Sequence, residues 1–494
     1  MKKKLISILI TTCMIFSFAA CSTDSNAGSP SADPTDAVNP TEEPTATSTP
    51  SVSEKDLTAI AGTIKVAVPD WQIDAENKRL IDGGFTELYP NINIELVPWN
   101  NSLNEWITAQ AAIDDLPDVA IYNWESIPYL VSQGLLYPLN DLYANDPEAQ
   151  YIIPALKEKY NYNGKYFAVP YNVAIRTVGI NLDMLNELNA DVPSANWTFD
   201  QFKELSQKAT SDTTSGINYI DWYEEVFSCA FAPAGKGPWG YDYATGKFNF
   251  TDGNFEQAIK AIRDLKGVPG LISDDLKNSE LVDNGEVDDY GKKFGENADG
   301  IALGKILITT AATWDWSWFK NYTFSKDLYS IPTLDGSMKV TCYSDASFII
   351  NGTESPEAAY EALKWFTFGE KGYEAHINWE LNDDLDSEGN HAPSLWLPAS
   401  TNPNSIALFN SLEYVPNGLK ELYSKMDTAV IGDLGKYVPG WNDVYNAELS
   451  SVIQSCLTGE SDPAAVSSEL EQKVNDAIKI YQDEFNANFQ KHYQ

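Results

Sequence analysis

Histidine is scarce in this chain of 494 residues, and the three that occur are far apart. His376, His391 and His492 show no metal-ligand spacing, and the sequence contains no GxSxG, HExxH, Walker or CxxC motif. A zinc site and a histidine-centred catalytic triad are therefore poorly supported. We predict no catalytic residue, no bound metal and no cofactor.

Basic residues are also few. Lysine and arginine number 33 against 71 aspartates and glutamates, which gives a formal net charge of −38. Such a protein repels nucleic-acid phosphates, so we expect no DNA or RNA partner. We interpret the charge as a source of solubility, and it does not identify a ligand.

Cysteine occurs only five times and without close pairs. Cys13 and Cys21 lie in the N-terminal region, whereas Cys229, Cys342 and Cys456 are far apart in the sequence. An odd number in an exported chain leaves at least one thiol unpaired. For these three residues we favour buried, apolar thiols.

Three short patterns resemble functional motifs, but each is only a weak indication of a functional site. The string Gly235–Gly240 matches GxGxxG, yet it follows no clear strand, so we expect a loop. Asp384–Glu388 resembles the start of a calcium loop, but its twelfth position would be Leu395 instead of glutamate. A solvated acidic loop is favoured there over calcium binding. The neighbouring Glu224 and Glu225 could serve a glycosidase, but adjacent acids are expected by chance in so acidic a chain.

The first 21 residues have the pattern of a bacterial export signal. Lys2–Lys4 are followed by the apolar stretch Leu5–Phe18. Phe18–Cys21 then resembles a lipobox, so we predict cleavage before a lipidated Cys21. The alternative is an ordinary secretory signal with a chance cysteine.

Residues 22–58 are rich in Ser, Thr, Pro and acidic residues and contain almost nothing that could fill a core. We interpret them as a disordered stalk. Lipid and stalk would hold the folded part at the extracellular face of the cell membrane. Beyond the signal, no stretch is long and apolar enough to span a bilayer.

The chain after Gly62 alternates strand and helix patterns. Five elements follow one another: strand Thr63–Pro69, helix Asn77–Leu88, strand Asn93–Pro98, helix Leu103–Ile113 and strand Leu116–Tyr122. This order predicts an α/β fold with a parallel sheet and crossover helices.

Local signals place further elements. Thr198–Gln201 is a capping-box pattern before a helix over Phe202–Ala209. Ser355 and Pro356 predict the start of a helix that runs through Phe368. Thr245–Gly246 indicates a hairpin between 241–244 and 247–250.

Aromatic residues are abundant: 14 Trp, 26 Tyr and 20 Phe. A flat ring can cover the apolar face of a sugar while carboxylates and amides bind its hydroxyls. We assign Trp106, Trp197 and Trp365 to packing, because tryptophans in regular elements are more often core. Seven candidates for the site stand in predicted loops after strands: Trp71, Tyr122, Trp124, Tyr171, Trp222, Tyr223 and Trp441. Trp314 and Trp316 are further candidates; with Trp318 they alternate along the chain, which predicts one outward and one inward face.

An ordered series of segments carries a family resemblance. The segments are Leu116–Tyr122, Asn163–Asn172, Val178–Leu185, Asn196–Phe202 and Gly304–Trp314. Together they resemble the extracellular solute-binding proteins of ABC importers, in the sugar-binding group that includes maltose-binding protein. One departure is Ser344–Asp345, which stands where many members have two glycines.

The resemblance implies a periplasmic-binding-protein-like fold, with two α/β lobes joined by a hinge and a ligand cleft between them. The expected lobes are residues 59–172 with 346–372, and residues 173–345 with 373–494. To the aromatic candidates the resemblance and the strand ends add Glu125, Asn172, Asp315 and Asp345 as ligand-binding residues.

The implied function is that of a membrane-anchored solute-binding lipoprotein. It would capture a carbohydrate, with an oligosaccharide favoured, and deliver it to an ABC permease as a monomer without catalysing a reaction. Two alternatives stay open at this point: a secreted glycoside hydrolase, and a glycan-binding lipoprotein without a role in transport.

Overall fold

The computed structural model describes residues 56–382 and 393–494. The export signal, Cys21, nearly all of the expected stalk and the acidic loop Asp384–Glu388 lie outside these residues. The folded part begins slightly earlier than expected: Leu57–Ala59 forms a 3-10 turn capped by the Asp56 carboxylate, and Leu57 packs against the core.

A first sheet contains the three strands expected to be parallel. Its order is β2 (Ile92–Trp99), β1 (Gly62–Pro69), β3 (Val119–Asn123), β12 (Ala346–Ile349) and β6 (Val169–Pro170). β1 pairs in parallel with both β2 and β3, which confirms the parallel arrangement, whereas β12 is antiparallel to its neighbours. The crossovers contain α1 (Ile73–Asp82), α2 (Phe85–Leu88) and α3 (Leu103–Ala112).

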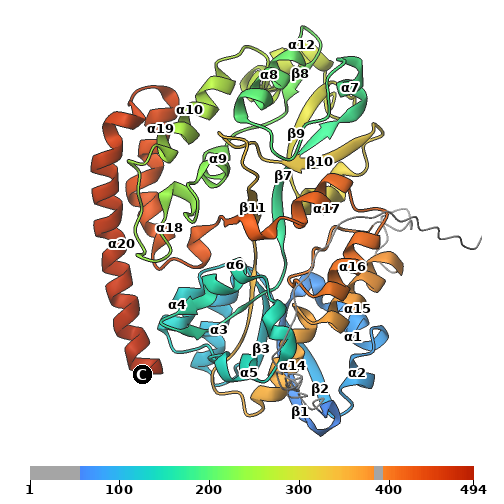
Figure 1. The fold of residues 1–494 in the computed structure, drawn as a ribbon, viewed down its shortest axis with the longest axis vertical. Helices are drawn as coiled ribbons and strands as arrows, with labels where there is room; N and C mark the ends of the chain where they lie inside the picture. Colours follow the sequence, from blue (N-terminus) through green and yellow to red (C-terminus); the bar gives the residue numbers. More distant parts are fainter. Residues whose placement is uncertain (1–55, 383–392) are drawn as a thin grey trace, which may run out of the picture. The chain divides into compact units, whose positions relative to one another are not determined.

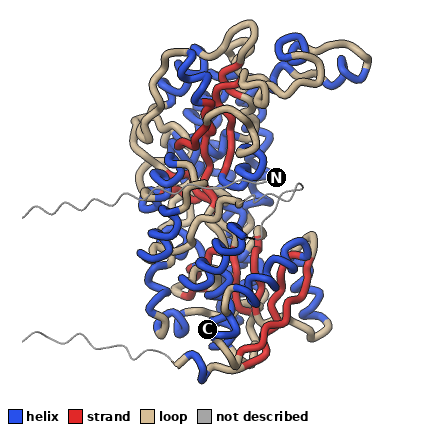
Figure 2. Tube along the Cα trace, turned by 90° about the vertical axis from the view of Figure 1, so that its right-hand side faces the viewer, coloured by secondary structure: helices blue, strands red, loops and turns tan. Residues whose placement is uncertain are grey.

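A second, mixed sheet is built from later strands. Its order is β13 (Ala429–Ile431), β11 (Val340–Tyr343), β7 (Ala174–Asn181), β9 (Ile306–Ala312) and β8 (Ser215–Ile217), and β10 (Lys326–Ser330) also pairs with β7. Most strands of the described residues belong to these two sheets, which form two separate groups (Figure 2). The fold is therefore α/β with two mixed sheets.

Two segments connect the sheets directly. The chain leaves the first sheet after β6 and enters the second at β7, and it returns between β11 and β12. These crossings consist of residues 171–173 and 344–345. Because both are short, they bring the ends of the two sheets close to each other.

Helices cover the two sheets (Figure 1). Those not yet given are α4 (Ile127–Ser132), α5 (Asn140–Ala144), α6 (Pro154–Lys157), α7 (Leu182–Glu187), α8 (Phe199–Lys208), α9 (Tyr223–Phe231), α10 (Asn254–Lys266), α11 (Ser279–Asp283), α12 (Asp289–Phe294), α13 (Trp316–Phe319), α14 (Pro356–Phe366), α15 (Glu370–Asn382), α16 (Pro403–Ser411), α17 (Asn417–Tyr423), α18 (Trp441–Val444), α19 (Ser450–Thr458) and α20 (Pro463–Tyr493). The long α20 packs on α4, α10 and α18. A short hairpin joins β4 (Asn161–Tyr162) to β5 (Lys165–Tyr166).

The helix-start signals are confirmed. Thr198 accepts the backbone N–H of Gln201 at 3.3 Å, and the Gln201 side chain accepts the N–H of Thr198 at 2.8 Å, so the capping box is complete. The helix begins at Phe199, earlier than expected, since it starts directly after its cap. Pro356 occupies the first position of α14, which ends at Phe366.

Two expected elements differ from the structure. The helix over 77–88 breaks at Gly83–Gly84, where Gly84 has a φ of +85°. The hairpin at Thr245–Gly246 is reduced to a single antiparallel bridge. The reason is that the N–H groups of Phe248 and Phe250 donate to side chains of α20 instead of to a partner strand.

The expected lobe boundary lies between residues 372 and 373. This position falls inside α15, a continuous helix that packs on α1 and α14 beside the first sheet.

The core confirms the packing assignments. Trp197 and Trp365 are buried, and Trp106 packs half-buried against a core cluster. Cys229, Cys342 and Cys456 are buried free thiols, as expected. Among the described residues, no helix combines the length and the apolar character that crossing a bilayer requires.

Candidate functional site

A cavity of about 710 Å³ opens where the two crossings meet the sheet ends. It is lined by residues of both sheets and of the loops around them: Tyr122, Trp124, Asn172, Val173, Ala174, Arg176, Trp222, Glu225, Val226, Thr313, Trp314, Ser317, Tyr343, Ser344, Asp345, Ser394, Leu395, Trp396, Leu397, Asp433 and Lys436. The volume is in the range of small-molecule sites.

Aromatic side chains form much of the cavity wall. Trp222 and Trp314 are 70% and 48% exposed, so large parts of both indoles face solvent. Tyr122 and Trp222 have φ angles of +65° and +66°. Left-handed backbone is unfavourable for bulky residues, and such outliers gather at functional sites. The chain therefore accepts strain to place two aromatic rings here.

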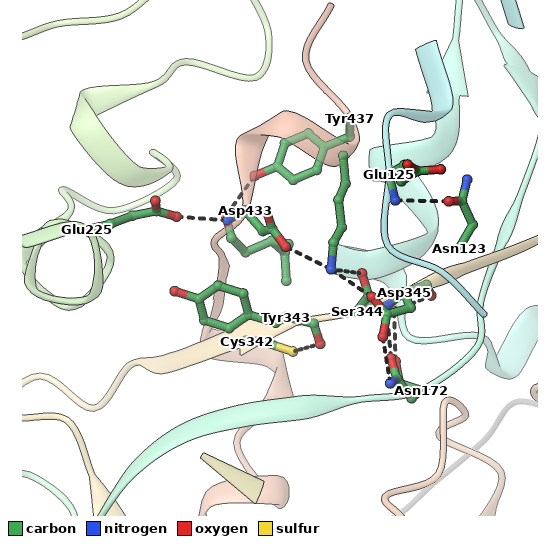
Figure 3. Close-up of polar contacts among 12 residues, drawn as sticks. Asn123, Glu125, Asn172, Glu225, Cys342, Tyr343, Ser344, Asp345, Asp433 and Tyr437 are labelled. Carbon is green, nitrogen blue, oxygen red and sulfur yellow. Dashed lines mark hydrogen bonds and ion pairs between the residues drawn. The ribbon is translucent and has the colours of Figure 1, made fainter. Parts of the chain in front are cut away.

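The two crossings are joined by a pair of reciprocal hydrogen bonds (Figure 3). The Asn172 amide donates to the Asp345 carboxylate at 2.9 Å, and the Asp345 backbone N–H donates to the Asn172 side-chain oxygen at 2.8 Å. The Ser344 hydroxyl adds a bond to the Asn172 carbonyl at 2.7 Å. Side chains thus fix the two crossings against each other.

A lysine forms ion pairs with two carboxylates at the cavity edge. The Lys436 ammonium lies 2.7 Å from both Asp345 and Asp433. Burial lowers the pKa of Lys436, but the two carboxylates outweigh this effect and raise its pKa above the ordinary value. The lysine is therefore charged at every physiological pH, and it ties the crossing to the loop after β13.

Glu225 of α9 is a carboxyl group with an unusual proton affinity. Burial, followed by the nearby Asp433 charge, raises the pKa of Glu225 to about 7. Its oxygen accepts the Asp433 backbone N–H at 2.9 Å, as Figure 3 shows. Near neutral pH the group is present in both protonation states, so it can donate to or accept from a ligand hydroxyl.

Arg176 of β7 stacks on the aromatic wall. Its guanidinium carbon lies 4.6 Å from the ring centre of Trp314 and 5.4 Å from that of Tyr343. Its Nε is buried and has no hydrogen-bond partner within the described part of the chain. A planar guanidinium in this position orders Trp314 and can present its other N–H groups to a ligand.

Six of the residues predicted from the sequence line this cavity: Tyr122, Trp124, Asn172, Trp222, Trp314 and Asp345. Two more contact the wall residue Tyr122 without lining the cavity, and of these Trp71 is 63% exposed. Tyr171 packs edge-on against Tyr122 with ring centres 4.9 Å apart, and Trp71 does so at 5.5 Å. These two residues position Tyr122 and are not themselves part of the lining.

The remaining predicted residues have other surroundings. Trp316 is buried against Phe319 in the core, because the chain turns into a helix there and does not continue as an alternating strand. Asp315 accepts the Ala312 backbone N–H at 2.8 Å and so caps that turn. Tyr223 is buried at the start of α9.

Glu125 and Trp441 border a second cavity of about 850 Å³, which shares Trp124 with the first. Glu125 accepts the backbone N–H of Asn104 at 2.7 Å and thereby caps α3. Trp441 stacks on Phe248 with ring centres 4.5 Å apart.

Fifteen lining residues were not predicted from the sequence, and six of them have charged or aromatic side chains: Arg176, Glu225, Tyr343, Trp396, Asp433 and Lys436. One signal was present, since Arg176 is one of only three arginines and interrupts an apolar strand. Trp396 belonged to the aromatic count but follows no strand. Asp433 and Lys436 had no signal, because nothing local distinguishes them from other surface charges.

Comparisons with known proteins agree with this architecture. Residues 69–370 match the bacterial extracellular solute-binding protein family. The sugar-binding protein MalE of Xanthomonas citri has a similar structure, with a TM-score of 0.62 and 14% identity over 86% of this chain and 99% of that one. No curated protein matches the sequence.

Two further solved structures share the fold. One is an ABC substrate-binding protein of Listeria monocytogenes in complex with cycloalternan, with a TM-score of 0.58 and 16% identity over 85% of this chain and 99% of that one. The other is the GacH receptor of Streptomyces glaucescens, studied with acarbose. It has a TM-score of 0.54 and 16% identity over 86% of this chain and 99% of that one. Because the family match spans more than half of the sequence, this protein belongs to the bacterial extracellular solute-binding proteins, which bind solutes and are not enzymes.

Proposed function

We propose that this protein captures a carbohydrate, with an oligosaccharide favoured, in the cavity at the crossings and delivers it to an ABC permease. The observation that carries the proposal is the composition of the wall. Exposed indole faces such as Trp222 and Trp314 lie beside Arg176, Asp345 and Glu225. Aromatic faces cover the C–H surface of a sugar, and charged or amide groups bind its hydroxyls.

The comparisons support this choice of ligand. Two proteins of similar structure are named with cycloalternan and with acarbose, and a third is named as sugar-binding. The cavity also suits a neutral polyol. Lys436 and Arg176 together balance the charges of Asp345 and Asp433, so a charged ligand is not needed.

We further propose that the two sheets are the cores of two lobes that close on the sugar. In this proposal the first lobe contains residues 59–172 and 346–382, and the second contains 173–345, followed by the C-terminal part from 393. The bonds between Asn172 and Asp345 would make the paired crossings a defined hinge. Cys21, if lipidated, would hold the protein at the membrane beside its permease.

A thermal-shift panel of mono- and oligosaccharides tests the proposed ligand class. A sugar at one hundred times its Kd stabilises the native state by about 2.7 kcal/mol, which gives a clear rise in Tm. We expect at least one neutral oligosaccharide to do this. If no sugar changes the Tm at millimolar concentration, while a non-sugar solute does, the carbohydrate proposal is wrong.

Calorimetry on two tryptophan variants then tests the cavity. Trp314→Ala should weaken binding of the active sugar by about 2 kcal/mol, or about thirtyfold, as expected for a large aromatic contact. Trp318→Ala is the matched control, because Trp318 lies four residues away, is 38% exposed and does not line the cavity. Equal losses of sugar affinity in both variants would contradict the assignment of this cavity as the sugar site.

A further inference from the structure

A histidine lies directly behind one wall of the cavity. The imidazole of His376 stacks on the indole of Trp396, with ring centres 3.9 Å apart and planes 20° from parallel. His376 belongs to α15 and is buried, whereas Trp396 lines the cavity. One aromatic stack therefore connects a buried titratable group with the proposed sugar site.

The Nε2 atom of His376 faces two partners with opposite requirements. It lies 3.1 Å from an Arg79 nitrogen, which can only donate, and 3.2 Å from a Glu380 carboxylate oxygen. A neutral ring can accept from Arg79 through this nitrogen. A protonated ring can only donate, so its Nε2 must choose Glu380.

Charged groups of both signs surround His376. The titratable groups near it come from three elements: Glu76 and Arg79 of α1, Tyr373 and Glu380 of α15, and Tyr171 after β6. Two carboxylates face one guanidinium, so a neutral His376 leaves one excess negative charge, which the imidazolium would compensate. Within the described residues, the Nε of Arg79 is buried without a hydrogen-bond partner.

The same cluster holds the cavity wall at a second point. The other carboxylate oxygen of Glu380 accepts the backbone N–H of Ser394 at 2.7 Å, and Ser394 lines the cavity together with Trp396. Glu380 thus bonds to His376 and to the wall at once. A change in the hydrogen bonding of His376 reaches the wall through this bond and through the aromatic stack.

We propose that His376 is a positioning residue whose protonation orders the wall segment 394–397 and tightens sugar binding. Protonation commits His376 to Glu380 and places a cation beneath the Trp396 indole, which strengthens the stack. Affinity is then highest at mildly acidic pH and falls as the pH rises through the range in which imidazoles titrate. This inference rests on the proposed function, since the wall belongs to the proposed sugar site.

The first test needs no ligand. A protonated imidazole quenches the fluorescence of a stacked indole, so wild-type emission should fall as the pH drops from about 7.5 to about 5.5. Trp396→Phe removes the reporter and His376→Gln removes the titrating group, while Gln can still hydrogen-bond. Both variants should lose the same component of the change. If either variant retains it in full, the coupling between His376 and Trp396 does not exist.

The second test measures binding by calorimetry, with maltotriose, raffinose and the other sugars of the panel as probes. For a sugar that binds, the wild-type Kd should rise about threefold or more between pH 5.5 and 7.5, and His376→Gln should show a flat profile. Parallel profiles in the two proteins would overturn the proposal.

If His376→Gln does not fold, an NMR titration of His376 in the wild-type protein gives a third test. Linkage requires that a sugar which binds the protonated form more tightly moves the NMR titration midpoint of His376 upward by the same factor. An unchanged midpoint would overturn the proposal. If no sugar binds at all, the proposed function fails, and the fluorescence test still decides whether His376 controls Trp396.

Discussion

Replacing Glu225 by glutamine should make the protein more stable at alkaline pH. Glu225 lies in the wall of the cavity, and burial together with the Asp433 charge raises its pKa from 4.5 to about 7. Glutamine keeps an oxygen that can accept the Asp433 backbone N–H. The substitution therefore removes the cost of ionising this group while leaving its hydrogen bond in place.

The direction of this change in stability with pH follows from proton linkage. The folded state binds the Glu225 proton more tightly than the unfolded state, so the wild type is most stable relative to the variant below about pH 4.5. This advantage is lost as the pH rises from about 4.5 to about 7. The full change in the free energy of unfolding across this pH range corresponds to about 3 kcal/mol. Because solvent reaches the cavity wall, we expect the variant to be about 1 to 3 kcal/mol more stable at pH 8.

Urea unfolding at pH 5, 6, 7 and 8 measures this difference. The free energies of unfolding of Glu225→Gln and wild type should diverge as the pH rises. Glu204→Gln is the control, because Glu204 is exposed on α8 and should give a constant difference. A difference for Glu225→Gln that does not change with pH, or a wild type that is the more stable protein at pH 8, would refute the reasoning.

Three further predictions concern the cavity, the core and the anchor. Lys436→Met leaves two carboxylates without their shared cation, so the free energy of unfolding measured in urea should fall by about 3 kcal/mol. A decrease below about 1 kcal/mol would contradict the role of Lys436 as the ion-pair partner of both aspartates. Trp365→Ala leaves a cavity in the core and should destabilise the fold by about 3 to 5 kcal/mol. Trp314→Ala, at the exposed wall, should reduce the stability by less than half as much. Equal melting curves of the two variants would contradict this difference. If Cys21 carries the proposed lipid, Cys21→Ser should release the protein from membrane fractions, because the acyl chains would supply the membrane affinity; unchanged fractionation would contradict the proposed anchor.

The sequence was most informative where local chemistry determines structure. Period-two apolar runs predicted β1, β2 and β3, and the capping box at Thr198 predicted the start of α8. Boundaries were less accurate, because tertiary contacts decide them. Gly83 shows this: a Cβ there would lie 2.5 Å from the Cβ of Ala375, so the close approach of α1 to α15 requires glycine and a break.

The site was predictable only in part, for a physical reason. Residues at strand ends and crossings, such as Trp124, Asn172 and Asp345, could be placed from the order of elements. Trp396 and Lys436 reach the cavity from segments that follow the second crossing and the first sheet, and no local pattern encodes that approach. Alternation also misplaced Trp316, since the chain forms a helix where a strand was assumed.

A crystal structure with the most stabilising sugar of the panel tests the central claim most directly. We expect electron density for the sugar in the cavity at the crossings, with a pyranose face against Trp314 or Trp222 and its hydroxyls within hydrogen-bonding distance of Arg176, Asp345 or Glu225. Density for the sugar only in the second cavity beside Trp441, or at a surface away from both, would contradict the assignment of this cavity as the binding site.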